Sequence, residues 1–236
     1  MVRELLYAPI IHSESDLGSL GAAIDKRSAS LYGEKRWAEH KETVARFWRS
    51  VADYLLSLEA ASLKIYQDGL AANGELGRRI VEEAGKRGSM NHQVIWQLLS
   101  KGAEVRKTED ASLLMEELRL AREESGAASI PNPGDLSFSR ARLMEERDRF
   151  IARTIDETLK QGETAVLFIG AYHNVHLYLP GDIAVKYLKE QERVKAYFEE
   201  LTSGGKGRRF QELARYLTCP IADIAEPGRN RARQST

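Results

Sequence analysis

The chain has 236 residues, of which 42% are hydrophobic and 30% charged, so it has the composition and length of a globular protein with one core. Lysine and arginine together number 35, as do aspartate and glutamate, so no net field favours nucleic acid or an anionic membrane. The single cysteine, Cys219, excludes an internal disulfide and a cysteine-based zinc site. No stretch approaches the roughly 20 apolar residues of a membrane span, and the first apolar run is too short for a secretory signal. We therefore expect a cytoplasmic protein without nucleic-acid or membrane partners.

The first predicted strand covers residues 5–11 and ends at His12. Pro9 interrupts this strand, and because proline cannot donate to a ladder, we expect a bulge or an edge position there. A long amphipathic helix is predicted over residues 33–59. His40 lies on its apolar face, where a packing role is favoured.

The second predicted strand covers residues 62–69 and has Asp68 at its carboxyl end. A third, weaker strand over residues 102–110 ends in Glu109 and Asp110. Asp110 has an alternative role as the cap of the helix that follows. The helices of this half of the chain are predicted over residues 74–87, 90–100 and 112–124.

Residues 126–136 contain two prolines and two glycines and are predicted to form a loop, either a lid over the strand ends or an exposed connection. A helix follows over residues 139–161, and Arg147 lies within its apolar stripe. A buried guanidinium must find a carboxylate or another acceptor, because an unpaired buried charge is very costly. We expect Arg147 either in a structural salt bridge or as a clamp for an anionic or carbonyl group.

Residues 165–169 form an uninterrupted apolar run, which is typical of a strand buried on both faces. The run ends at Gly170, where glycine allows a sharp turn, and His173 follows three residues later. The remaining predicted elements are a strand over 182–188, helices over 189–201 and 208–217, and a disordered basic tail over 226–236.

Together these elements predict one α/β domain over residues 1–225, with a mixed, mostly parallel sheet of about five strands and helices on both faces. Open α/β sheets bind their ligands beyond the carboxyl ends of the strands. We therefore expect His12, Asp68, Arg147 and His173 to converge in one hollow at that end of the sheet.

Two segments carry a resemblance to a known family: residues 146–152 (ERDRFIA) and residues 162–173 (GETAVLFIGAYH). Together with the opening strand that ends in a histidine, they resemble the TraB/Tiki superfamily and its ChaN-like and erythromycin-esterase-like relatives. The resemblance spans about residues 5 to 190. Two departures stand out: the first site, Pro9 to His12, lacks the glycine of the family's GxxH, and Asp68 stands where many relatives have glutamate.

The resemblance implies several functions, because its members include metal-dependent proteases, His/Glu esterases, haem binders and regulators of pheromone signalling. Kinship at the level of the fold cannot choose among them. A hydrolase that acts on a peptide, amide or ester bond of a small-molecule or peptide substrate is favoured. Whether the chain forms a homo-oligomer stays open.

In the metal-dependent version of this hydrolase, His12, His173 and Asp68 are ligands of Zn²⁺ or Mn²⁺, with Glu14 as the alternative carboxylate. Glu109 is then the general base, and Arg147 stabilises the oxyanion. In the metal-free version, His12 or His173 is the general base on water, oriented by Glu14 or Asp68, while Arg147 holds the substrate.

Two hypotheses do not involve catalysis. In the first, the loop over residues 126–136 encloses a flat ligand such as haem together with Tyr172 and Tyr178, with a histidine as axial ligand. In the second, the chain is a regulatory member of the superfamily that has lost its catalysis, which the missing first glycine favours.

Overall fold

Five parallel strands form one sheet in the computed structural model, which describes residues 2–13, 16, 21–126, 133–203 and 207–221; residues 121–126 and 133–137 are described by their backbone alone. The order across the sheet is β3-β2-β4-β1-β5. Every pair of neighbouring strands is parallel, which confirms the predicted α/β class and strand number. The strands are β1 (Arg3–Ile10), β2 (Leu63–Gln67), β3 (Glu104–Arg106), β4 (Thr164–Gly170) and β5 (Ile183–Tyr187).

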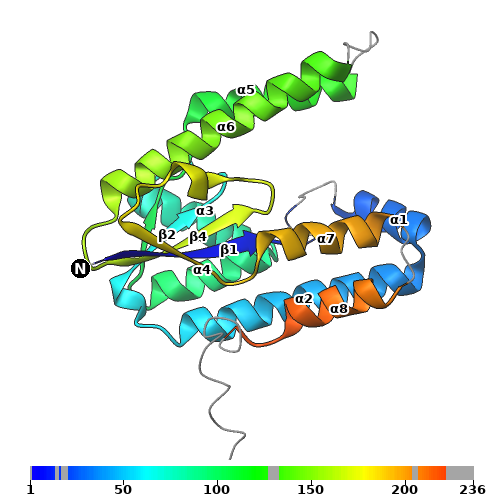
Figure 1. Ribbon diagram of the computed structural model, residues 1–236, viewed down its shortest axis with the longest axis horizontal. Helices are drawn as coiled ribbons and strands as arrows, with labels where there is room; N and C mark the ends of the chain where they lie inside the picture. Colours follow the sequence, from blue (N-terminus) through cyan, green and yellow to red (C-terminus); the bar gives the residue numbers. More distant parts are fainter. Residues whose placement is uncertain (1, 14–15, 17–20, 127–132, 204–206, 222–236) are drawn as a thin grey trace, which may run out of the picture.

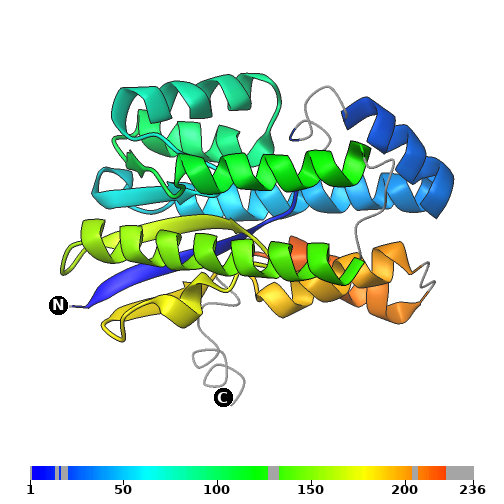
Figure 2. The ribbon, with the colours of Figure 1, turned by 90° about the horizontal axis from the view of Figure 1, so that it is seen from above.

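Helices cover both faces of this sheet, as predicted (Figure 1). Figure 1 shows α6 on one side and α2, α4 and α8 on the other, while Figure 2 shows α6 running along the sheet from above. The helices are α1 (Gly21–Tyr32), α2 (Glu34–Leu56), α3 (Gly74–Lys86), α4 (Met90–Ser100), α5 (Ala111–Gly126), α6 (Pro133–Thr158), α7 (Gln191–Thr202) and α8 (Arg208–Thr218), with short 3₁₀ turns η2 (Ala60–Ser62) and η3 (Val175–Tyr178).

The two faces of the sheet have separate apolar cores, because successive side chains of a strand point to opposite faces. Leu6 of β1 and Phe168 of β4 face the larger core, which α2, α4, α7 and α8 complete. Tyr7 of β1 and Leu167 of β4 face the smaller core, where α6 provides Ile151 and other apolar residues. Alternate side chains of each central strand therefore pack against different helical layers.

Pro9 forms no bulge, and β1 is not the edge strand of the sheet, but the pairing of β1 with β5 has ended before Pro9, so the predicted edge position is correct for that side of the backbone. Pro9 pairs in regular register with Ile169 of β4, inside the sheet. The backbone carbonyl of Tyr7 accepts the N–H of Leu188, so alternate residues of β1, including Pro9, turn their backbone groups toward β5. The pairing of β1 with β5 ends at Tyr7, and Pro9 thus lacks its N–H where no strand needs it.

The predicted bounds of the loop over residues 126–136 were wrong, because helices extend into both ends of this segment. Gly126 is the last residue of α5, and α6 begins at Pro133. Proline suits the first turn of a helix, since its missing N–H has no intrahelical partner there in any case. Residues 127–132 and the predicted tail at 226–236 lie outside the described residues.

Within the part of the chain that the structure describes, every helix is too short or too polar to cross a membrane. His40 of α2 is a packing residue, as predicted: it is buried, and its Nδ1 lies 3.0 Å from the hydroxyl of Tyr197. Burial lowers the pKa of His40 to about 4, so its ring is neutral at pH 7.

Candidate functional site

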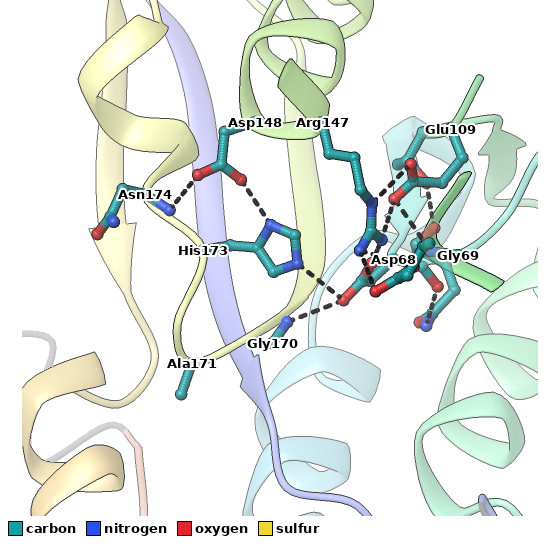
Figure 3. A network of polar contacts seen from close by, with 12 residues as sticks. Asp68, Gly69, Glu109, Arg147, Asp148, Gly170, Ala171, His173 and Asn174 are labelled. Carbon is teal, nitrogen blue, oxygen red and sulfur yellow. Dashed lines mark hydrogen bonds and ion pairs between the residues drawn. The ribbon is translucent and has the colours of Figure 1, made fainter. Parts of the chain in front are cut away.

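Four of the predicted residues meet beyond the carboxyl ends of neighbouring strands (Figure 3). Asp68 follows β2, Glu109 lies just beyond β3, and His173 follows β4. Arg147 reaches them from α6, the helix above this part of the sheet. The strand order puts β2 directly beside β4, and the backbone N–H of Asp68 continues their ladder by donating to Phe168 O over 2.9 Å.

His173 is held by a carboxylate that the sequence analysis did not assign, that of Asp148 on α6. Its Nδ1 lies 2.5 Å from Asp148 Oδ1, and Asp148 Oδ2 accepts the backbone N–H of Asn174 over 2.7 Å (Figure 3). An ionised carboxylate only accepts hydrogen bonds, so Nδ1 carries the proton and Nε2 is the nitrogen left for other partners. Both residues are buried.

The Nε2 atom of His173 faces Asp68, whose Oδ2 is 3.6 Å away. Burial works against a charged imidazole, but the hydrogen bond to Asp148 and the negative charge of Asp68 outweigh it, so the pKa of His173 is raised above 6.5. The ring therefore lies between two carboxylates and gains a proton readily. Proton transfer at Nε2 is the chemistry that this arrangement supports.

Asp68 links the histidine to the arginine. Its Oδ2 accepts the backbone N–H of Gly170 over 3.2 Å, and its Oδ1 accepts a hydrogen bond from Arg147 Nη2 over 2.8 Å. A side chain at residue 170 would start 3.4 Å from the ring of His173 and 3.5 Å from Asp68 Oδ2. The chain turns sharply after Gly170, as predicted, and the N–H of His173 donates to the Gly170 carbonyl over 3.1 Å. Gly170 has no positive φ, so this turn does not itself require glycine, but the two nearby site residues limit the size of a side chain here.

Arg147 is surrounded by carboxylates, which confirms that a guanidinium in the apolar stripe of α6 finds acidic partners. Its Nη2 and Nε donate to the two oxygens of Glu109 over 2.6 and 3.2 Å, and its Nη1 contacts both oxygens of Glu117 at 3.1 Å. Burial opposes the charge of Arg147, but the bond to Glu109 and the charges of Asp68 and Glu109 raise its pKa above the usual range. The guanidinium is thus a permanent cation beside His173.

Glu109 is deeply buried, with a side-chain exposure of 0%. Burial raises its pKa, and the hydrogen bonds from Arg147 offset part of that effect. A third donor is the backbone N–H of Gly69, 3.4 Å from Glu109 Oε1. Gly69 has φ +78°, a left-handed conformation that favours glycine, and this turn directs its N–H toward Glu109.

The remaining two predicted residues are not in this network. The side chain of His12 is 60% exposed, its Nδ1 lies 3.8 Å from Asp16, and it lines a cavity with Trp37 and His40. These last two residues belong to α2, on the face of the sheet opposite α6. Glu14 lies outside the described residues.

The predicted metal ligands therefore do not come together. Among the residues that the structure describes, no three histidine, cysteine, aspartate or glutamate side chains are arranged to hold a metal ion. Two of the predicted ligands, Asp68 and His173, face each other, but Asp68 already binds Arg147 and Gly170. A permanent guanidinium charge at this position also opposes a second cation. The site does not fit the predicted three-ligand Zn²⁺ or Mn²⁺ centre.

Asp148 was detectable in the sequence by its spacing. Residues 148, 151, 152, 155 and 159 recur at the three-and-four interval of one helix face, and all five are buried. A carboxylate in such a stripe needs a donor, as Arg147 next to it does. The identity of that donor could not be read from the spacing alone.

Comparison of the chain with models of known protein families, with characterised proteins and with solved structures finds no match. The resemblance to the TraB/Tiki superfamily thus stays a prediction that depends on residues 146–152 and 162–173.

Proposed function

We propose that this protein is a hydrolase that cleaves an ester, amide or peptide bond by general acid–base catalysis, with His173 as the proton-transfer group. The observation that carries the proposal is the pair of contacts on one ring: Nδ1 bound to Asp148 at 2.5 Å and Nε2 facing Asp68 at 3.6 Å. An imidazole whose Nδ1 is fixed by a buried carboxylate has one defined nitrogen for chemistry. This is the metal-free version of the predicted hydrolase.

In the first step, neutral His173 removes a proton from water at Nε2 while the water oxygen bonds to the carbonyl carbon of the substrate. The imidazolium that forms lies between Asp148 and Asp68, and both negative charges stabilise it. In the second step, the bond from the carbonyl carbon to the leaving oxygen or nitrogen breaks, and Nε2 returns the proton to that atom. The products are a carboxylic acid and an alcohol or amine.

In this version Arg147 holds the substrate, and its permanent positive charge suits an anionic group. Glu109, predicted as the general base, has a different role in the proposal: both of its oxygens bind Arg147 and its side chain is fully buried. It positions the guanidinium. The general base is His173.

The haem-binding alternative depends on residues 126–136, and the side chains of all of these residues lie outside the part that the structure describes. Tyr172 is 60% exposed, and Tyr178 stacks against the guanidinium of Arg149 at 4.4 Å. That alternative stays a prediction.

The test is turnover of a panel of chromogenic esters, anilides and short peptides by purified protein, with and without a chelator. We expect hydrolysis that is insensitive to the chelator and is lost in His173→Asn. The matched control is His12→Asn, which removes a histidine that lies outside the network and which should retain full activity. Loss of activity in His12→Asn or on chelation would restore the metal hypothesis, and absence of turnover across the panel would contradict a hydrolase.

A further inference from the structure

A cavity of about 200 Å³ opens beside Arg147, between α5 and α6. Leu120, Leu143 and Met144 give it apolar walls, and Arg140, Arg147 and Glu117 give it polar ones. Among the polar side chains of this cavity, that of Arg147 is more than nine-tenths buried, with 6% of it exposed. A small cavity that combines a buried cation with apolar walls has the chemistry to bind an amphipathic anion.

The three carboxylates around Arg147 differ in how firmly they are held. Glu109 is fully buried and uses both oxygens, and Asp68 is mostly buried and binds at 2.8 Å. Glu117 is 49% exposed, and its two oxygens share the single nitrogen Nη1 at 3.1 Å each. An ion pair with one partner half in water contributes little, so the Glu117 contact is the weakest of the three.

If the carboxylate of a ligand takes the place of the Glu117 side chain at Arg147, the net charge around the guanidinium does not change. A displaced Glu117 side chain would return to solvent, where water and salt screen its charge. The incoming carboxylate would meet a planar guanidinium edge suited to carboxylate geometry. Its apolar part would replace water along Leu120, Leu143 and Met144.

We infer that Glu117 occupies the place of a substrate carboxylate, and that the substrate carries a carboxylate on a short apolar arm which displaces Glu117 from Arg147. This inference rests on the proposed function, because the bound molecule is a substrate only if the protein is a hydrolase. Binding of a carboxylate at Arg147 does not depend on catalysis. Asp68 stands between Arg147 Nη2 and His173 Nε2, so the anionic group and the scissile carbonyl lie on separate sides of Asp68 (Figure 3). The substrate class is then an ester or amide with a free carboxylate at its far end.

The experiment is calorimetric titration of the full chain with hexanoate, with hexylamine as the charge-reversed control. We expect Glu117→Gln to bind hexanoate about tenfold more tightly than the wild type, because the internal competitor is gone. The matched control is Glu116→Gln, which removes a neighbouring carboxylate of α5 that pairs with Arg119 instead. Met144→Trp, which fills the cavity from a partly exposed position, should abolish hexanoate binding.

Four outcomes overturn the inference: no hexanoate binding to Glu117→Gln, an equal gain in Glu116→Gln, unchanged binding in Met144→Trp, or equal binding of hexylamine. A parallel assay compares a nitrophenyl monoester of adipate with neutral nitrophenyl hexanoate. Preference for the monoester, increased in Glu117→Gln, supports the inference. If neither ester is hydrolysed, the proposed function fails while the hexanoate titration still decides whether the carboxylate site exists.

Discussion

Asp148 binds His173 and the residue after it at the same time: one oxygen lies 2.5 Å from Nδ1 of the ring, and the other accepts the N–H of Asn174 over 2.7 Å. The carboxylate thus fixes both the ring and the backbone that carries it. Because α6 supplies Asp148 and β4 leads into His173, the geometry of the ring depends on how that helix packs on the sheet.

We expect Asp148→Asn to lower hydrolytic turnover by about 10²-fold or more, because the ring loses the partner that orients it and stabilises its cation. The pKa of His173 should fall, since the hydrogen bond to Asp148 raises it. The rising limb of the pH–rate profile, which follows deprotonation of the base, should then move to lower pH. NMR titration of the His173 ring measures this shift directly. Glu145→Gln, on the exposed side of the same helix, is the control and should leave the titration unchanged.

The raised pKa of His173 also predicts how stability depends on pH. Burial alone lowers this pKa, but the two carboxylates raise it above the value of about 6.5 in the unfolded chain. The stabilisation from the protonated ring is therefore fully present below about pH 6.5 and is lost as the pH rises through the folded-state pKa. In urea unfolding between pH 5 and 9, the difference in free energy of unfolding between wild type and His173→Gln should become smaller as the pH rises. A difference that grows with pH would contradict the assignment.

Glu109 and Glu117 contact the same guanidinium, but their substitution should affect the stability of the protein to very different extents. Glu109→Gln removes a fully buried partner of a buried cation and should lower the free energy of unfolding by about 3–5 kcal/mol. Glu117→Gln removes a half-exposed partner and should cost less than about 1 kcal/mol. Denaturant unfolding of the two variants side by side measures the difference, and equal costs would show that burial does not separate the two contacts.

Gly170 should tolerate one methyl group and no more. An alanine Cβ would make ordinary contacts of 3.4 Å to His173 and 3.5 Å to Asp68, so Gly170→Ala should retain most of its turnover. Gly170→Val, which suits a strand, should keep the fold but displace the ring, and turnover should fall by about tenfold or more. A fully active Gly170→Val with an unchanged melting temperature would mean that the ring is not held against this backbone.

Much of the fold could be predicted because its signals are local. Apolar runs mark β1 and β4, the first broken only by Pro9, and the three-and-four spacing marks α2 and α6. The same reasoning required a carboxylate or another acceptor for Arg147, since burial of an unpaired guanidinium is too costly. It also put Asp68 and His173 at the same end of the sheet, because parallel strands end together.

The tertiary structure decided which residues at that end meet. His12 and His173 follow adjacent strands, yet Trp48 Nε1 binds the carbonyl of Ile11 over 2.9 Å and holds the chain against α2, while Asp148 holds His173 against α6. Periodicity assigns a side chain to a face only inside a helix or strand. Beyond the last paired residue, the direction of a side chain depends on contacts with elements far away in the chain, and these exist only once both helical layers have packed on the sheet.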